Sequence, residues 1–208
     1  MPDFSFEQGL NKTDLIVGLD EAGRGPWCGP VVAACVGWPD LQCPDDLACA
    51  INDSKKLTPQ KRELLFDKIQ AATPIWGIGQ ASAKEIDEIN ILQASFLAMR
   101  RALDEVIKKG YTPSVALIDG NRLPTWDMEK YAIIGGDGKS LSIAAASILA
   151  KVTRDRIMVD LARKYPYYGW EKNAGYGTKA HQTGLAQHGI TPEHRRSYAP
   201  IKKFLETT

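Results

Sequence analysis

The stretch LIVGLDEAGRGP, residues 15–26, joins a predicted strand to two acids and a glycine-rich loop. Its apolar part, Leu15 to Leu19, indicates a buried strand. Asp20 and Glu21 follow directly, and their side chains would point to opposite faces if the strand continued. The glycines after them let the chain leave extended geometry. We therefore expect both carboxylates to turn toward one site.

The loop after the acids, Gly23-Arg24-Gly25, is suited to an anionic ligand. The glycines carry no side chain that would keep a ligand away from the backbone, and the arginine offers a forked donor to phosphate. The stretch thus predicts a metal site beside a phosphate-binding loop. The alternative interpretation is a strand that ends in acids because it reaches solvent, followed by an ordinary turn.

Apolar runs elsewhere predict the remaining strands. They lie at residues 30–38, 75–81, 115–119 and 131–134 and are rich in β-branched residues, alanine and tryptophan. The first of these runs is close enough to the strand at 15–20 to form a hairpin with it.

Helices are expected over residues 58–72, 82–110 and 142–164, where apolar residues recur at helical spacing or alanine is abundant. Thr58 before a proline, and Ser82 with Glu85, are signals of helix starts. This order of elements is typical of an α/β domain with a mixed sheet flanked by helices. We place that domain at residues 1–164 and a small helical cap at residues 165–208.

Charge is distributed unevenly along the chain. Of 26 Lys and Arg and 25 Asp and Glu, residues 1–138 hold 14 basic and 20 acidic side chains, and residues 139–208 hold 12 and 5. The two parts therefore carry −6 and +7, which sum to the formal net charge of +1. An acidic front part and a basic tail fit a carboxylate metal site next to a polyanion-binding surface.

Composition narrows the class of protein further. No segment is long and apolar enough to span a membrane, and the first ten residues show no signal-peptide core. The four cysteines, Cys28, Cys35, Cys43 and Cys49, form no C-x-x-C pair, so we interpret them as reduced, small hydrophobic residues. We expect a cytoplasmic protein.

Acids recur after three of the predicted strands: Asp20 with Glu21, then Asp119, then Asp137. Parallel strands deliver their C-terminal ends to one edge of a sheet, so these carboxylates are expected to converge. Oxygen ligands without His or Cys favour Mg²⁺ or Mn²⁺, and four acids suit two divalent ions about 3.5–4 Å apart. The alternative for Asp119 and Asp137 is a plain turn.

The chain resembles bacterial ribonuclease HII, of the type 2 ribonuclease H family. The resemblance rests on motifs that occur in the family's order: residues 20–26, 53–57, 118–120, 136–137, 144–155 and 175–178. It implies a ribonuclease H-like fold and an endonuclease that hydrolyses the RNA strand of RNA–DNA hybrids. It also implies ribonucleotide excision repair, with cuts 5′ to single ribonucleotides in duplex DNA by two-metal-ion, in-line water attack that leaves 5′-phosphate and 3′-hydroxyl ends.

The resemblance also implies roles for particular residues. The family's four catalytic, metal-binding acids fall on Asp20, Glu21, Asp119 and Asp137. Its loop that senses the ribose 2′-hydroxyl falls on Gly23, Arg24 and Gly25, and its tyrosine that packs on the sugar falls on Tyr176. Trp27 and Cys28 stand where members often carry Leu-Ala, which we expect to alter packing beside the loop rather than the chemistry.

Further residues are weaker candidates for substrate contacts. Lys55 and Lys56 are phosphate contacts or part of a solvated loop, and Lys151 with Arg154 one turn later is expected to line the duplex channel. His181 is a phosphate contact or a structural histidine of the cap. We expect close helix packing from Ser147, and core packing from Trp76, Trp126 and Trp170.

The sequence is also compatible with two other functions. One is a DNA-strand nuclease or resolvase of similar architecture, which would need no 2′-hydroxyl sensor. The other is a nucleic-acid-binding protein without catalysis, in which the acids would be fortuitous. For the favoured function we expect a monomer that needs no obligate protein partner.

Overall fold

A five-stranded mixed sheet forms the centre of the computed structural model, which describes residues 1–10 and 15–207. The strands lie in the order β3-β2-β1-β4-β5. Their bounds are β1 Ile16–Ala22, β2 Val31–Gly37, β3 Trp76–Ala81, β4 Val115–Asp119 and β5 Glu129–Ile133. Antiparallel pairing of β1 with β2 confirms the predicted hairpin, and β1, β4 and β5 run parallel to one another.

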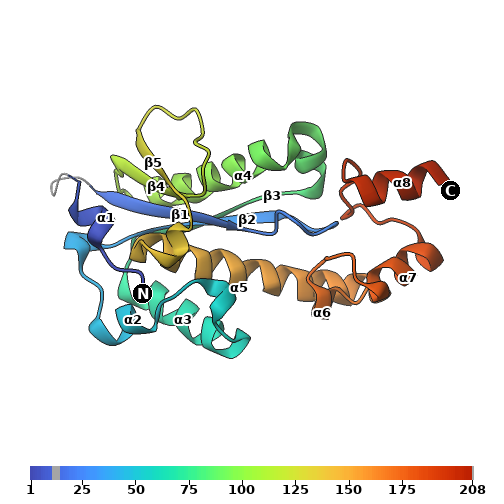
Figure 1. Cartoon of the computed structure of the whole chain (residues 1–208), viewed down its shortest axis with the longest axis horizontal. Coiled ribbons are helices and arrows are strands. Elements are labelled where there is room, and N and C mark those ends of the chain that lie inside the picture. Colours follow the sequence, from blue (N-terminus) through green and yellow to red (C-terminus); the bar gives the residue numbers. More distant parts are fainter. Residues whose placement is uncertain (11–14, 208) are drawn as a thin grey trace.

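One long helix covers each face of the sheet (Figure 1). They are α4, Ala83–Lys108, and α5, Leu141–Lys164, and the second shares its face with α2, Asp45–Ala50, and α3, Pro59–Ala72. Side chains alternate between these faces along each strand. In β2, for example, Ala33 and Cys35 belong to the core between the sheet and α4, whereas Ala34 and Val36 belong to the core between the sheet and α5. The predicted flanked mixed sheet is confirmed.

A glycine allows α5 to lie unusually close to the central strand. A Cβ atom on Gly18 of β1 would come within 2.3 Å of the backbone nitrogen of Ile143, in the first turn of α5. Contacts that short do not occur between real atoms, so this crossing needs a residue without a side chain. The helix start is therefore fixed against the strand that carries Asp20 and Glu21.

Local sequence signals place the helix starts as predicted. The Thr58 hydroxyl accepts a hydrogen bond from the Lys61 N–H, and Ser82 and Glu85 form a reciprocal capping box. The helix expected over residues 82–110 is interrupted, however, at Asn90, where φ is +68°. The Asn90 side-chain oxygen accepts hydrogen bonds from the next turn, which replaces the missing backbone acceptors at this break.

Several short elements were not predicted: α1 Ser5–Gln8, and the 3-10 turns η1 Pro39–Leu41, η2 Ser54–Lys56 and η3 Gly136–Gly138. The last of these corrects the expectation that Asp137 ends a strand. β5 stops at Ile133, Gly135 takes a left-handed conformation, and Asp137 then lies within η3.

Three helices follow α5 in the chain and lie toward one end of the molecule, with α6 beside the last part of α5 (Figure 1). They are α6 Trp170–Asn173, α7 Lys179–His188 and α8 Ala199–Thr207. A separate apolar cluster joins this region to the end of α5, with Cys28, Met158, Tyr168 and Trp170 at its centre. The division at residues 164 and 165 stays a proposal, and its two ranges include residues 11–14 and 208, outside the described part of the chain.

No helix in the described ranges is long and apolar enough to cross a membrane. The four cysteines are free; Cys28 and Cys35 are buried as small hydrophobic residues, whereas Cys43 is half-buried and Cys49 exposed.

Candidate active site

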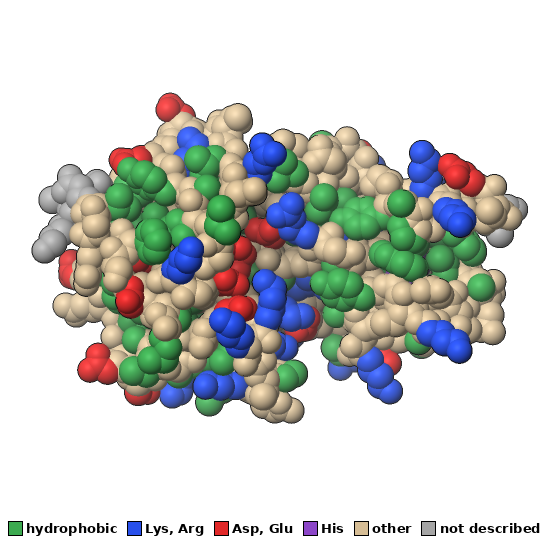
Figure 2. All heavy atoms as spheres, viewed as in Figure 1, with side chains coloured by type: hydrophobic (Ala, Val, Ile, Leu, Met, Phe, Trp, Pro, Cys, Tyr) green, Lys and Arg blue, Asp and Glu red, His purple; other side chains and the backbone are tan. Residues whose placement is uncertain are grey.

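Strand pairing brings the predicted acids to one edge of the sheet. Leu19 of β1 lies opposite Ile118 of β4, so the residues that follow them, Asp20 and Asp119, are neighbours across the two strands. Beyond β5, the short turn η3 adds Asp137 to the same edge. Figure 2 shows acidic side chains gathered in a hollow on one face of the molecule, with lysines and arginines along its margin.

Asp20 and Glu21 remain within the strand rather than leaving it. β1 continues to Ala22, and both acids stay paired with β2, which corrects the expectation that the chain abandons extended geometry at this point. Asp20 is 5% exposed, and its Oδ1 accepts a hydrogen bond from the Glu21 N–H at 2.7 Å. The Glu21 carboxylate accepts one from the Arg24 guanidinium at 3.2 Å.

The carboxylates influence one another electrostatically. Burial raises the pKa of Asp20 well above its ordinary value, and the nearby charges of Glu21, Asp119 and Asp137 raise it further. Burial likewise raises the pKa of Glu21. The positive charge of Arg24 lowers this pKa, and the negative charge of Asp119 raises it. Like charges raise each other's pKa only at close range. The four acids therefore form one electrostatic group.

Asp119 also holds the turn that carries Asp137. Its Oδ1 accepts a hydrogen bond from the Gly136 N–H at 2.7 Å. The pKa of Asp137 is raised by burial and by the charges of Asp119 and Asp53, while Lys55 Nζ lies 3.7 Å from its Oδ2. This makes Lys55 a neighbour of the acids, and it makes Asp53 a further acid at the site.

The donor set suits a hard divalent cation. It consists of carboxylate oxygens, and the raised pKa values of Asp20, Glu21 and Asp137 reflect crowded negative charge that such a cation would neutralise. Among the described residues, no three acid, histidine or cysteine side chains are closed around one point so as to hold a metal ion. Glu21 is paired with Arg24, and Asp137 lies 3.7 Å from Lys55.

The glycine-rich loop lies beside the predicted tyrosine. A Cβ atom on Gly25 would come 3.3 Å from Cε1 of Tyr176, whose side chain is 53% exposed. On the other flank of the tyrosine, a Cβ on Gly177 would meet the Trp27 ring at 2.0 Å. The tryptophan that departs from the family pattern therefore packs under the Tyr176 turn, as expected for a local packing change.

A buried histidine pair supports the same turn. The Thr191 N–H donates to His194 Nδ1 at 2.9 Å, so the hydrogen of that ring is on Nε2, which lies 3.0 Å from His181 Nε2. The Trp170 indole N–H donates to the same His181 nitrogen at 3.2 Å. His181 therefore carries its own hydrogen on Nδ1 and donates it to the Tyr176 carbonyl at 3.0 Å.

This network decides between the two interpretations of His181. Its ring is fully buried and both nitrogens are engaged, so it is a structural residue and the predicted phosphate contact is wrong. Arg154 is likewise buried and does not line a channel. Its guanidinium donates to the carbonyls of Cys28, Pro30 and Ala174, so it joins the segment before β2 to the cap.

The remaining candidates divide between surface and core. Lys151 Nζ is paired with Asp155 at 2.6 Å, and Lys56 Nζ lies 3.9 Å from Asp53 and is largely exposed. Ser147 and Trp170 are buried, which confirms that they pack.

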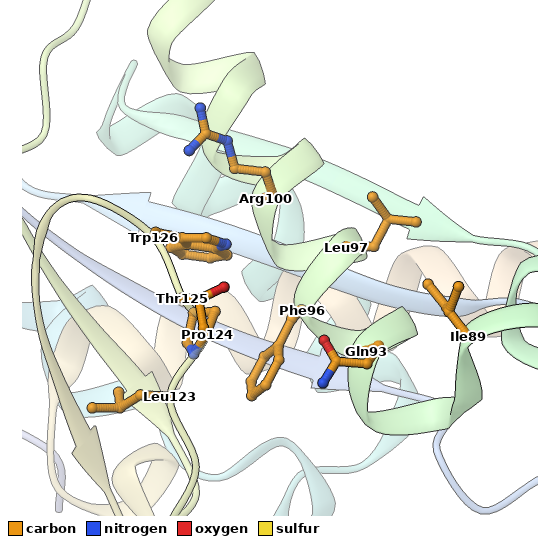
Figure 3. Close-up of a pocket in the computed structure, with 9 residues that line it drawn as sticks. All are labelled: Ile89, Gln93, Phe96, Leu97, Arg100, Leu123, Pro124, Thr125 and Trp126. Atoms are coloured by element: carbon orange, nitrogen blue, oxygen red, sulfur yellow. The ribbon is translucent and has the colours of Figure 1, made fainter.

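A hollow of about 410 Å³ lies between α4 and the segment after β4 (Figure 3). Phe96, Leu97 and Trp126 line it, and Trp126 is thus only half-buried. Phe96 also lines a small cavity of about 40 Å³ with Glu21, Arg24 and Asp119. The hollow therefore adjoins the acidic edge.

Two residues of this region were missed at the sequence level. Arg195 and Tyr198 reach the glycine-rich loop from the C-terminal region. No strand end or helix cap marks them, and 172 residues separate Arg195 from Gly23. The place of Asp53 near the site could have been suspected, because it is the first residue of the motif at residues 53–57.

Comparison with known proteins agrees with this arrangement. The sequence model of the family Ribonuclease HII matches residues 17–201. The chain is 52% identical to a ribonuclease HII of Magnetococcus marinus, over 98% of this chain and 95% of that one, and 51% identical to one of Gluconobacter oxydans, over 99% and 97%.

Solved structures show the same fold. Ribonuclease H2 from Pyrococcus horikoshii superposes with a TM-score of 0.74 at 28% identity, over 92% of this chain and 97% of that one. The match to the family covers both the acidic edge and the C-terminal region that contacts it. The chain belongs to the ribonuclease HII family, and it is a nuclease that cleaves the RNA strand of RNA–DNA hybrids.

Proposed function

We propose that this nuclease also cuts duplex DNA on the 5′ side of a single embedded ribonucleotide. The observation that carries the proposal is the position of the loop 23–25, which lies between the acidic edge and Tyr176. A phosphate at the acids would place the adjoining sugar near the loop and the ring. Recognition of one ribose, rather than of a long RNA strand, needs contacts confined to such a small area.

Asp20, Glu21, Asp119 and Asp137 are the residues that we propose to hold two divalent ions, Mg²⁺ or Mn²⁺. When bound, such ions polarise the phosphate and lower the pKa of a water molecule. The water oxygen forms a bond to phosphorus in line with the bond to O3′, which breaks. The products are a 3′-hydroxyl, which takes up a proton, and a 5′-phosphate on the ribonucleotide.

Residues around the acids have proposed roles in binding. Lys55 and Lys56 are exposed cations that suit phosphate contacts, although each lies near an acid of the site. Lys151 is held by Asp155, so it contributes to the basic margin rather than to a dedicated contact. The exposed Tyr176 ring packs on the sugar, and residues 165–208 act as the cap on the duplex. We expect a cytoplasmic monomer with no obligate protein partner.

Asp119→Asn tests the catalytic assignment. The substitution removes a charge from the metal-binding group but keeps an oxygen that can accept from the Gly136 N–H. Cleavage of a duplex with one ribonucleotide should fall by about a hundredfold or more, since metal ligation is lost. Duplex affinity should persist, because less negative charge faces the phosphates. Rates would be measured in single-turnover assays with Mg²⁺ and with Mn²⁺.

The substrate comparison separates this function from its rivals. Wild-type protein should cut the duplex that contains one ribonucleotide and leave the matched all-DNA duplex intact. Efficient cutting of the all-DNA duplex would favour the DNA nuclease, and binding without cutting would favour the non-catalytic protein. Near-normal rates for Asp119→Asn at saturating metal would reject the ligand role of this acid.

A further inference from the structure

The Arg195 guanidinium is buried beside the glycine-rich loop, and its N–H groups donate to the loop, to Gly29 and to Tyr198. Nε donates to the Gly29 carbonyl at 3.0 Å. Nη2 donates to the carbonyls of Gly29 at 2.9 Å and Gly23 at 2.6 Å. Nη1 donates to the Arg24 carbonyl at 3.0 Å and to the Tyr198 hydroxyl oxygen at 2.9 Å. An arginine has five such donors, so this one is fully satisfied.

The Tyr198 hydroxyl completes the arrangement by donating its own hydrogen to the Arg24 carbonyl. That carbonyl therefore accepts two hydrogen bonds from the C-terminal region. Arg154 also contacts the loop, because its side chain occupies the space where Gly23 would carry a Cβ. Two buried arginines thus contact the loop. Among the described residues, only Arg195 bonds to the Gly23 carbonyl, whereas Arg195 and Tyr198 share the Arg24 carbonyl.

Because peptide groups are planar, this contact also fixes the direction in which the neighbouring N–H groups point. Each trans peptide is planar, with its C=O and its N–H pointing in opposite directions. The chain has no cis peptide in the ranges described. The Gly23 carbonyl shares a plane with the Arg24 N–H, and the Arg24 carbonyl shares one with the Gly25 N–H. Because Arg195 draws both carbonyls toward itself, both N–H groups point away from it, and neither donates to another described residue.

We propose that Arg195 and Tyr198 are positioning residues that set the specificity for ribose, by aiming the N–H groups of Arg24 and Gly25 at the sugar. This inference rests on the proposed recognition of a single ribonucleotide by the loop. A fixed N–H that meets the 2′-hydroxyl oxygen gains a hydrogen bond, and it is left without a partner by deoxyribose. The residues act through the loop and touch no reacting atom.

Binding preference measures this role directly. In the full chain with Asp119→Asn, which is expected to slow cleavage by about a hundredfold or more, Kd would be measured by fluorescence anisotropy in Mg²⁺ for two duplexes before the substrate is cut. One contains a single ribonucleotide and the other is the same sequence in DNA. The preference is the ratio of the two Kd values. Tyr198→Phe removes one hydrogen bond to the loop, Arg195→Lys removes several while keeping the charge, and Arg196→Lys is the matched control on an exposed neighbour.

We expect the preference to fall about threefold for Tyr198→Phe and about tenfold for Arg195→Lys, and to stay unchanged for Arg196→Lys. A general loss of protein stability would weaken binding to both duplexes alike and would leave the ratio of the two Kd values unchanged. If circular dichroism shows that Arg195→Lys does not fold, the result for Tyr198→Phe alone tests the inference. A folded Tyr198→Phe variant with the full preference would overturn the inference. Equal affinity for the two duplexes before these substitutions would instead reject ribose recognition by the loop, and with it the proposed function.

Discussion

Asp20 illustrates, at the scale of a single residue, how a site useful for chemistry opposes folding. Its carboxylate is almost fully buried and lies near three other acids, which is why its pKa is raised. A group whose folded-state pKa is above its unfolded value loses stabilisation as pH rises through the folded pKa. At a pH above the ordinary pKa of an aspartate, the buried Asp20 carboxyl group therefore destabilises the fold.

Asp20→Asn should consequently stabilise the protein while abolishing its activity. The amide keeps an oxygen for the Glu21 N–H but removes the buried charge. We expect Tm in a metal chelator at neutral pH to rise by roughly 2–4 °C, which corresponds to about 1 kcal/mol in a chain of this size. Asp67→Asn, on an exposed residue of α3, is the control and should leave Tm unchanged. A fall in Tm for Asp20→Asn would show that its charge is favourably paired.

Arg195 and His181 show, at the same scale, what one sequence cannot reveal. Both are polar residues in a basic C-terminal part, where exposure is the ordinary expectation. Their burial depends on partners that are distant in the chain, such as the Gly23 carbonyl and the Trp170 indole. The acids were predictable because strand ends mark them, although Asp137 needed the turn η3 to reach the edge.

At the scale of elements, the contact between β1 and α5 positions much of the site. The helix starts directly after η3, and Gly18 lets it cross the strand just before Asp20. Two of the acid-bearing segments therefore share one close contact. A disturbance there would act on the site without changing any of its residues.

Gly18→Ala should destabilise the protein for that reason. The added methyl group would overlap backbone atoms of Ser142 and Ile143, which have little freedom to move. Overpacking of this kind costs about 1–3 kcal/mol in free energy of unfolding, measured by urea denaturation. Gly9→Ala is the matched control, because φ is −71° there and its Cβ would make an ordinary contact at 3.4 Å. Equal stability of the two variants would contradict this account of the crossing.

Elements whose signals are local were predicted best. Thr58 and Ser82 bond to backbone within three residues, so the caps follow from the sequence nearby. The break at Asn90 and the continuation of β1 to Ala22 were not predicted. Asparagine occurs within many helices, and the pairing with Val32 that extends β1 becomes apparent only when the sheet is assembled.

At the scale of the whole molecule, buried polar groups as well as apolar packing join the residues after α5 to the segment at residues 23–30. Besides the two arginines, His181 and His194 lie inside the C-terminal region in neutral form. Burial, with a smaller contribution from the neighbouring His181, lowers the pKa of His194 to about 4. The stability of this region therefore depends on pH.

The sign of this dependence follows from proton uptake. As pH falls below about 6.5, the unfolded chain protonates this histidine, whereas the folded protein does so only near pH 4. The unfolded state then binds more protons, so the free energy of unfolding should decrease between these values. Urea denaturation from pH 7 to 4 measures it, with His194→Gln as the comparison because glutamine does not titrate. The decrease should be smaller in that variant, and identical slopes would assign the acid sensitivity to other groups.

The long separation between Gly23 and Arg195 has a consequence for synthesis on the ribosome. The sheet and its two long helices are complete once residue 164 has emerged, and the chain then already holds Asp20, Glu21 and Asp119 on strands and Asp137 on η3. The Arg195 side chain that fixes the loop follows later, at a synthesis rate of about 5–20 residues per second. The nascent chain thus acquires its acidic edge before it acquires the residue that we propose to orient the loop, and the selectivity for ribose that we propose arises only after residue 195 has been added.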